Sequence, residues 1–325
     1  MDSGEIIDHS GAHAKGCHSM SWQVRLSLVL LFVTPGFWTV NYLIARLYVG
    51  EIEPHALALL RWTVALCVLL PFCIGEISRA WPLSSQERRE FLLMGAFGMW
   101  ICGAFVYIAG QTTSSVNIGL LYALSPVLIS YASAKLLREP FGWVQSVGVG
   151  LALLGMVWVV LKGDLLQLGA LEFTPGDVWI LVCVVSWTLY SLRLKSVPTR
   201  FSAIARLSLI TAGGVMVLIP FTLIEFAITP NWAITPLGLW YVLLVGIFPG
   251  VGAYVCYAYM QLHLGAARTS VVLYFGPIYA ALAGWALLGE TPMLFHLMGG
   301  LAILVGVYLV NRPVQTPSPR VDQAD

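Results

Sequence analysis

The stretch that decides the fold is residues 113–162, TSSVNIGLLYALSPVLISYASAKLLREPFGWVQSVGVGLALLGMVWVVLK, because a similar stretch recurs at residues 264–313. The positions that match at an offset of 151 are Pro126 with Pro277, Glu139 with Glu290, Gly148 with Gly299, and Gly155 with Gly306. Each copy is typical of an apolar helix with a proline in its middle, a short turn with a glutamate, and a second apolar helix rich in glycine. A repeat this long predicts two related halves and not a solenoid, whose units are about 20 to 50 residues long.

The composition predicts an integral membrane protein. Of the 325 residues 58% are hydrophobic and 10% are charged, and the mean hydropathy is +0.83. A soluble domain carries about 25% charged residues, so most of this surface must face the lipid bilayer. The scarcity of charge also argues against a nucleic-acid partner.

Neither a cofactor nor a metal is predicted. The cysteines of the apolar segments show no CxxC or His/Cys spacing and are interpreted as packing residues. His9, His13, Cys17 and His18 have a spacing that suits a metal, but they fall in a polar stretch, 1–21, for which we expect a disordered tail.

Ten segments are long and apolar enough to cross a bilayer, which needs about 20 residues. They are, approximately, 23–45, 54–75, 89–110, 113–134, 142–162, 176–195, 202–225, 237–261, 265–288 and 293–311. The sequence therefore predicts an all-α integral membrane fold of ten transmembrane helices.

The distribution of basic residues predicts the orientation. With the N-terminus in the cytoplasm, thirteen of the 17 Lys and Arg residues fall on the inside and only Arg46 and Lys162 fall outside. Such a bias is the usual mark of the cytoplasmic side. We therefore expect a multi-pass protein of the inner cell membrane with both termini in the cytoplasm.

The repeat extends over the whole chain. FWTVNYLIAR (37–46) aligns with SWTLYSLRLK (186–195) at an offset of 149, and Tyr107 aligns with Tyr257 at 150. Since each unit has five spans, the second must enter the membrane from the opposite side, as in many secondary transporters. The predicted order is a cytoplasmic tail 1–21, a first repeat 22–162, an external linker 163–175, a second repeat 176–311, and a cytoplasmic tail 312–325.

Polar and aromatic side chains form matching stripes on six of the predicted helices. Lipid offers no partner to an amide or a phenol, so these stripes should face protein or water. We expect them to line a central substrate cavity, although each side chain could instead join helices by hydrogen bonds. The candidate substrate-binding residues are Trp38, Asn41, Trp100, Tyr107, Gln111, Asn117, Tyr122, Ser125, Trp187, Tyr190, Tyr254, Tyr257, Gln261 and Tyr274.

Five further residues are candidates for binding or gating. Pro126 and Pro277 each remove a backbone donor in mid-helix and are interpreted as hinges or static kinks. Glu139 and Glu290 are expected to cap the helices that follow them, with gating as the alternative. Arg61 lies inside a span and is a candidate for a carboxylate contact or a gate ion pair.

A proton-coupled pump usually keeps a carboxylate within the membrane, and no Asp or Glu of this sequence falls in the middle of a predicted span. This pattern favours a facilitator or an exchanger. The glycine-rich faces of the fifth and tenth predicted helices suit close contact with neighbouring helices or with a second protomer, so a homodimer stays open.

Taken together, FWTVN (37–41), ALLRW (58–62), SPVLISYASAKLLREP (125–140) and GPIYAALAGWALLGETP (276–292) resemble the drug/metabolite transporter superfamily, whose members are built from EamA-type repeats. The resemblance covers about residues 22–311 and implies a central pocket between the halves with alternating access. Members export or exchange amino acids, other metabolites, nucleotide sugars or lipophilic cations. The chain departs from the pattern at Gly289, where the first copy has Arg138.

The resulting prediction is a non-enzymatic exporter of small organic metabolites, such as amino acids or related amphipathic or cationic compounds. An aromatic lining suits planar groups and, through cation–π contact, amines. An exchanger of a larger metabolite such as a nucleotide derivative, and a non-transporting scaffold or sensor, are the alternatives. An intramembrane enzyme is disfavoured because no His, Asp or Glu falls in the middle of a predicted span.

Overall fold

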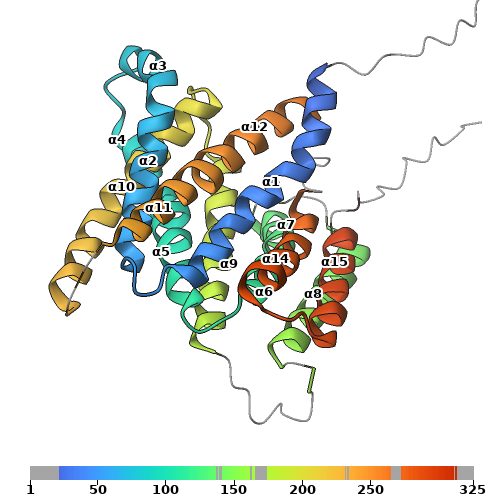
Figure 1. Ribbon diagram of the computed structural model, residues 1–325. Helices are drawn as coiled ribbons and strands as arrows, with labels where there is room; N and C mark the ends of the chain where they lie inside the picture. The colour runs from blue at the N-terminus through green and yellow to red at the C-terminus, as the bar shows by residue number, and fades with distance from the viewer. Residues whose placement is uncertain are drawn as a thin grey trace, which may run out of the picture.

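The computed structural model describes residues 22–136, 138, 141–161, 163–164, 174–230, 232, 234–264, 272–310 and 312. Every regular element in these ranges is a helix (Figure 1). The α-helices are α1 (Trp22–Leu47), α2 (Pro54–Leu69), α3 (Ile74–Arg79), α4 (Ser85–Gly95), α5 (Cys102–Gly110), α6 (Ser115–Tyr122), α7 (Ser125–Leu136), α8 (Trp143–Val160), α9 (Pro175–Ser196), α10 (Ala203–Ile228), α11 (Pro236–Val245), α12 (Ala253–Leu264), α14 (Val272–Leu288) and α15 (Leu294–Val310).

Seven helical segments in this part of the chain are long and apolar enough to cross a membrane: Trp22–Leu47, Pro54–Phe72, Ser85–Gly110, Ser115–Leu136, Pro175–Ser196, Ala203–Ile228 and Pro236–Met260. Three shorter apolar helices, Trp143–Val159, Phe275–Leu288 and Leu294–Val310, coincide with the predicted fifth, ninth and tenth spans. The predicted all-helical membrane fold is confirmed. A helix suits this setting because it satisfies its backbone polar groups within itself.

Within the described ranges, two π-helical segments interrupt the helices at matching places. Ala96–Ile101 joins α4 to α5, and Gly246–Gly252 joins α11 to α12. They begin 150 positions apart, within the offsets of 149 to 151 seen in the sequence. A π segment rotates the residues that follow it and leaves carbonyl groups free for other partners, and such segments are frequent at functional sites. Two of these carbonyls are bonded, Phe97 O by Ser186 Oγ and Met99 O by Trp62 Nε1.

Helices α8 and α15 pack closely side by side at one edge of the molecule (Figure 1). A Cβ added at Gly148 would lie 2.6 Å from the carbonyl oxygen of Gly306, and one added at Gly155 would lie 2.7 Å from that of Gly299. The sequence repeat pairs Gly148 with Gly299 and Gly155 with Gly306. If each residue is replaced by its equivalent in the other copy, the Gly148–Gly306 contact becomes the Gly299–Gly155 contact. Such a relation is expected when a pseudo-two-fold axis runs between the two helices.

Other helix contacts also recur in equivalent positions of the two sequence halves. Helix α2 packs against α10 at the opposite edge of the molecule (Figure 1). In the centre, α1 packs against α12 and α14, while α9 packs against α5, α6 and α7. The central helices from both halves of the sequence thus alternate around one region.

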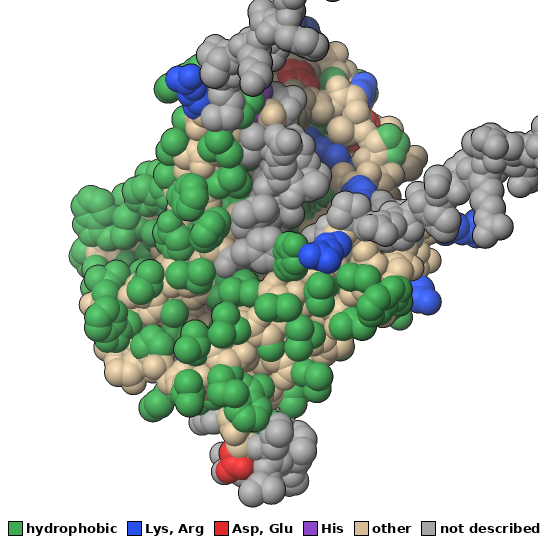
Figure 2. Space-filling view, turned by 90° about the vertical axis from the view of Figure 1, so that its right-hand side faces the viewer, with side chains coloured by type: hydrophobic (Ala, Val, Ile, Leu, Met, Phe, Trp, Pro, Cys, Tyr) green, Lys and Arg blue, Asp and Glu red, His purple; other side chains and the backbone are tan. Residues whose placement is uncertain are grey.

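Hydrophobic side chains cover most of the surface that faces the viewer in Figure 2, and the few Lys and Arg side chains lie toward its upper and right-hand edges. Among the described large hydrophobic residues that are exposed are Trp240 (63%), Leu223 (62%) and Phe226 (56%). Water would not tolerate so wide an apolar surface, whereas lipid does.

The predicted mid-helix prolines behave differently. Helix α6 ends at Tyr122 and α7 begins at Ser125, so Pro126 lies in the first turn of α7. Pro126 nevertheless lies near the middle of the membrane-crossing segment Ser115–Leu136, as predicted, and the helix is interrupted just before it, at residues 123–124. A proline has no N–H to bond the carbonyl four residues earlier, so an interruption at this place fits the predicted kink. Pro277 does lie inside α14. The terminal tails and Glu139 fall outside the described residues, as does most of the linker.

Candidate functional site

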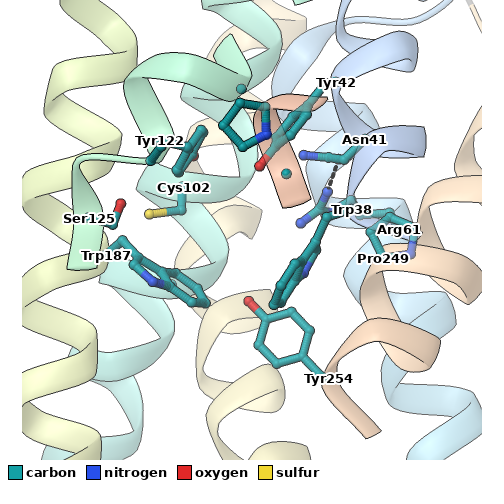
Figure 3. Close-up of a pocket in the computed structure, with 15 residues that line it drawn as sticks. Trp38, Asn41, Tyr42, Arg61, Cys102, Tyr122, Ser125, Trp187, Pro249 and Tyr254 are labelled. Atoms are coloured by element: carbon teal, nitrogen blue, oxygen red, sulfur yellow. Dashed lines mark hydrogen bonds between the residues drawn. The ribbon is translucent and has the colours of Figure 1, made fainter. Parts of the chain in front are cut away.

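A pocket lies where the central helices of the two sequence halves meet (Figure 3). The space not filled by atoms is about 820 Å³, its open mouth included. Its lining residues come from α1, α2, α5, α6, α7, α9, α12, α14, the turn after α6 and both π segments. They are Trp38, Asn41, Tyr42, Arg61, Gly98, Cys102, Gly119, Tyr122, Ala123, Ser125, Trp187, Pro249, Tyr254, Gly276 and Pro277.

Aromatic rings form two sides of this pocket (Figure 3). Tyr42 and Tyr122 are stacked, with ring centroids 5.8 Å apart and planes at 20°. On the other side the ring of Trp187 meets that of Tyr254 edge-on at 6.1 Å, near Trp38. Rings held in this way offer flat faces to an apolar or planar group of a ligand.

Of the described residues that line the pocket, Arg61 carries the charge. The residue Arg61 is 5% exposed, and its Nη1 donates to Asn41 Oδ1 at 2.5 Å and to the hydroxyl of Tyr107 at 2.8 Å. Tyr107 in turn donates to Asn41 Oδ1 at 2.8 Å. The guanidinium carbon also lies 4.4 Å from the centroid of Trp62. This network, from α1, α2 and α5, fixes the direction of the guanidinium.

Seven of the fifteen residues predicted to bind substrate, Arg61 included, line the pocket. The structure brings together Trp38, Asn41, Arg61, Tyr122, Ser125, Trp187 and Tyr254, along with Pro277. Ser125 is buried, and its hydroxyl has no hydrogen-bond partner among the described residues. Such an orphaned polar group suits a site that a polar ligand completes.

Three predicted residues form a layer behind the lining. Tyr107 is fully buried and reaches the pocket only through Arg61 and Asn41. Tyr190 packs on Trp187 at 5.1 Å, and Tyr257 packs on Trp38 at 5.8 Å. Tyr190 and Tyr257 thus support rings that line the pocket, and Tyr107 supports Arg61 and Asn41, but none of the three lines the pocket itself.

Trp100 lies elsewhere, and the prediction of a continuous stripe from Trp100 to Tyr107 is wrong. Trp100 stacks on Phe221 of α10, with centroids 3.8 Å apart. The π segment at Ala96–Ile101 changes the angular step between the residues before and after it, so the spacing of three and four no longer selects one face.

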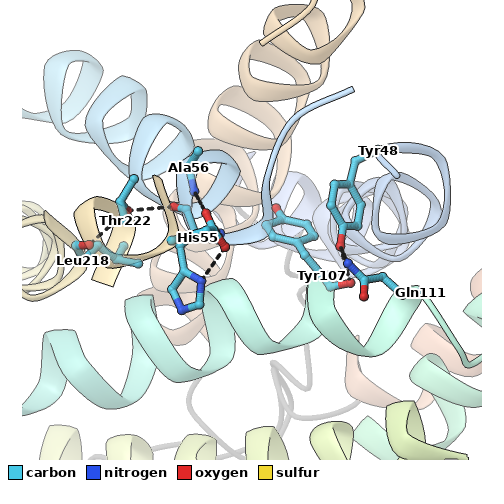
Figure 4. A network of polar contacts seen from close by, with 8 residues as sticks. Tyr48, His55, Ala56, Tyr107, Gln111, Leu218 and Thr222 are labelled. Carbon is cyan, nitrogen blue, oxygen red and sulfur yellow. Dashed lines mark hydrogen bonds and ion pairs between the residues drawn. The ribbon is translucent and has the colours of Figure 1, made fainter. Parts of the chain in front are cut away.

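Gln111 and Asn117 lie at a helix end rather than in the pocket. Gln111 is exposed and its Nε2 donates to the hydroxyl of Tyr48 at 2.9 Å (Figure 4). Asn117, in the first turn of α6, donates to Asp177 at 3.4 Å. Their depth in the span was misjudged because the helix boundaries could not be placed closely from hydropathy. Gln261 lies in α12 and Tyr274 lies in α14, but their side chains are not among those that the structure describes.

Glu290 caps a different helix from the one expected. Its carboxylate accepts bonds from the backbone N of Ser115 at 3.1 Å and from its hydroxyl at 2.6 Å, and it forms an ion pair with Arg46 at 3.3 Å. Glu290 therefore caps α6 and not α15, since the first turn of α6 brings its free N–H groups to the turn before α15.

Sequence reasoning missed Tyr42, Cys102, and the backbone positions Gly98 and Pro249. Tyr42 lies one helical turn after Trp38, a spacing that could have identified it. Gly98 and Pro249 each lie in a π segment, and neither composition nor periodicity reveals such a segment. In the described ranges no group of three His, Cys, Asp or Glu side chains could hold a metal ion.

Comparisons with known proteins agree with this architecture. The family model described as the EamA-like transporter family matches twice, at residues 25–161 and 174–312, and the chain therefore belongs to this family. The two matches coincide with the two halves that surround the pocket.

The relatives are transporters by name. An uncharacterized transporter of Archaeoglobus fulgidus is 25% identical over 87% of this chain and 96% of its own length. A probable terminal-alkyne amino-acid exporter of Streptantibioticus cattleyicolor is 25% identical, covering 88% and 92%. An S-adenosylmethionine/S-adenosylhomocysteine transporter of Chlamydia trachomatis is 23% identical, covering 82% and 83%. A solved crystal structure, at 20% identity and a TM-score of 0.59, covers 87% of this chain and 95% of that chain and supports the fold alone.

Proposed function

We propose that this protein is a secondary transporter that exports small organic metabolites across the inner cell membrane by alternating access. The observation that carries the proposal is the pocket itself. It is lined by rings and polar groups, it lies within a lipid-facing bundle, and helices of both halves contribute to it. A scaffold or sensor would not need such a chamber, and the charge of Arg61 and the amide of Asn41 would be costly against lipid.

The transport mechanism we propose uses ten spans in two inverted halves, 22–162 and 176–311, joined by the linker 163–175. The matched π segments and the exchange-related contacts of α8 with α15 support such halves. Rocking of the halves would open the pocket to one membrane face and then to the other. Pro277, which lines the pocket, and Pro126 are the proposed hinge positions, and the Glu290–Arg46 pair is a proposed gate contact.

The orientation we propose places both termini in the cytoplasm. Eleven described basic residues lie near helix ends. Ten of them lie at the end of the bundle where α1 begins, and Arg46 lies at the opposite end. The ten are Arg25, Arg79, Arg88, Arg89, Lys135, Arg138, Arg193, Lys195, Arg200 and Arg312. This asymmetry is the one expected of a cytoplasmic side.

The proposed substrates are amino acids or related amphipathic compounds. The ring faces and the hydrogen-bonding groups of the pocket suit a molecule with an apolar body and a polar end. The relative named as an amino-acid exporter supports this class. A larger metabolite is the second candidate, because another relative is named as an S-adenosylmethionine/S-adenosylhomocysteine transporter.

Flux through purified protein tests the proposal. Proteoliposomes loaded with a mixture of labelled amino acids and other small metabolites should release some of them faster than protein-free liposomes do. Release of none of them would contradict transport. Trp240→Ala is a suitable control, because Trp240 is 63% exposed on the apolar surface and does not line the pocket.

A further inference from the structure

We infer that Arg61 binds the carboxylate of the transported substrate, so that the pocket selects small organic carboxylates with an apolar body over amines and neutral analogues. This inference rests on the proposed transport function and names the substrate class for the same pocket. It starts from the hydrogen bonds of the guanidinium.

Among the described residues, hydrogen bonds engage one nitrogen of this guanidinium. Nη1 makes both hydrogen bonds, to Asn41 and Tyr107. Nε is buried without a partner, and Nη2 has no hydrogen bond with any described residue. A guanidinium has five N–H donors in a planar fork, so most of its capacity is unused while its position is fixed.

No acidic residue in the described ranges forms an ion pair with Arg61. The nine acidic side chains there lie near helix ends, and seven of them contact other residues: Glu51 contacts Thr235, Glu76 Ser202, Glu87 Arg200, Glu90 Arg193, Asp177 Thr113, Glu225 His55, and Glu290 Arg46. A buried cation without a counter-ion is strongly unfavourable in a low-dielectric interior. The amide, phenol and ring contacts of Arg61 offset part of that energy, and an anion in the pocket would offset the rest.

The arginine also breaks the internal symmetry of the chain. Structural features recur in both halves, including the π segments and the close glycine contacts. At the offset of 149, however, Arg61 corresponds to Ile210 and Asn41 corresponds to Tyr190. Ile210 is fully buried, so the equivalent place in the second half packs without a charge. A residue needed only to hold two helices together would be expected in both halves, whereas a pocket needs one carboxylate receptor.

The remaining lining fits the rest of such a substrate. A carboxylate can accept charge-assisted N–H bonds from the side of the guanidinium that Asn41 and Tyr107 leave unbonded, and such bonds are about twice as strong as those between neutral groups. The rings of Trp38, Trp187 and Tyr254 lie across the same space and would contact an apolar body (Figure 3). Because the charge of Arg61 is not neutralised, the pocket would repel amines that lack a carboxylate, in spite of its rings.

Binding of matched compounds to the full-length protein in lipid nanodiscs tests this inference. The probes are 3-phenylpropionate and L-phenylalanine, each compared with its own amide. The carboxylate of each pair should bind about tenfold or more tightly than the amide, because a charge-assisted hydrogen bond is worth roughly 1.5 to 3 kcal/mol. Equal or tighter binding of the amides, or no binding of either carboxylate, would overturn the inference.

Variants of Arg61 test whether this side chain causes the preference for carboxylates over amides. In Arg61→Gln the ratio of carboxylate to amide affinity should fall to about one, whereas Arg61→Lys should retain most of it. Arg206→Gln is the matched control, because Arg206 is the other arginine within a predicted span, its guanidinium donates to the Val197 carbonyl, and it does not line the pocket. A normal ratio in Arg61→Gln would overturn the assignment. If that variant does not fold, the wild-type comparison of acid with amide still decides the inference.

The proteoliposome experiment separates this inference from the transport function. Flux of amines or neutral solutes without flux of carboxylates leaves the transporter proposal standing and rejects the role of Arg61. Absence of flux for every solute rejects transport itself. Flux confined to carboxylates, lost in Arg61→Gln and kept in Arg206→Gln, supports both.

Discussion

Glu76 and Glu225 lie 149 positions apart, and each carboxylate caps a helix of the other sequence half. Glu76 accepts from the backbone N and the hydroxyl of Ser202, at the start of α10, both at 2.6 Å. Glu225 accepts from the backbone N of His55 at 3.0 Å and of Ala56 at 3.1 Å, at the start of α2 (Figure 4). The free N–H groups and the dipole of a helix start favour an anion. The two caps hold α2 and α10 together from both ends.

Replacement of Glu225 tests one of these caps. Glu225→Gln should lower the free energy of unfolding by about 1 to 2 kcal/mol, because a charged acceptor is lost from the start of α2 and from His55. Thermal unfolding in detergent measures the effect. Glu53→Gln is a control of opposite sign, since burial and the nearby Glu225 raise the pKa of Glu53 and its charge is unfavourable there. Equal destabilisation by both variants would contradict the capping role.

The other cap predicts a pH dependence. The hydrogen bonds from Ser202 lower the pKa of Glu76 below its ordinary value of 4.5. The folded state therefore binds this proton less readily than the unfolded state, and the stabilising contribution is present above pH 4.5 and disappears as the pH falls through the folded pKa. The stability difference between wild type and Glu76→Gln should shrink at acid pH. A difference that does not change with pH would count against this cap.

The contact of α8 with α15 predicts a contrast between two glycines. In Gly148→Ala the new Cβ would lie 2.6 Å from the Gly306 carbonyl oxygen and 2.8 Å from the Val310 N, so the two helices must separate. We expect a loss of about 1 to 3 kcal/mol, as for overpacking. Gly150→Ala, in the same helix, meets nothing within 4 Å and should be neutral or slightly stabilising. Thermal unfolding of both variants measures the difference in stability. Equal effects of the two substitutions would show that α8 and α15 do not approach closely at Gly148.

The aromatic lining predicts a loss of transport without a loss of fold. Trp187→Ala removes a ring that contacts Tyr254 on one side of the pocket and should lower substrate flux about tenfold or more, since a central Trp in an enclosed site typically carries about 2 kcal/mol of binding energy. Initial rates in proteoliposomes, corrected for the amount of monodisperse protein, give the measurement. Flux equal to that of Trp240→Ala would exclude Trp187 from the substrate site.

The sequence alone was sufficient for the class of fold because lipid imposes a simple rule on hydropathy and charge. It also identified residues such as Trp38, Asn41 and Trp187, whose positions in the two copies match and which line the pocket or, like Tyr190, pack directly behind it. The repeat placed these residues more reliably than periodicity within one helix did.

What could not be predicted depended on local departures from the ideal helix. The π segment before Cys102 turns Trp100 toward Phe221. The target of the Glu290 carboxylate depends on which helix ends lie side by side, and hydropathy does not report on this. The errors at Trp100 and Glu290 thus arose from backbone geometry and packing that a spacing argument does not contain, and those at Gln111 and Asn117 arose from helix boundaries that hydropathy does not place closely.

The central claim is that the pocket opens to water during transport, and the reactivity of a single cysteine tests it most directly. Ser125→Cys, in a variant without other cysteines, places the thiol in the pocket lining. Ser133→Cys is the matched control, because both serines lie in α7, are buried, and have no hydrogen-bond partner among the described residues, while Ser133 does not line the pocket. An anionic, membrane-impermeant methanethiosulfonate is added to either side of sealed vesicles. The account predicts modification of Cys at 125 from at least one side, with none at 133, and protection at 125 by a transported solute. A thiol at 125 that stays unreactive from both sides would contradict it.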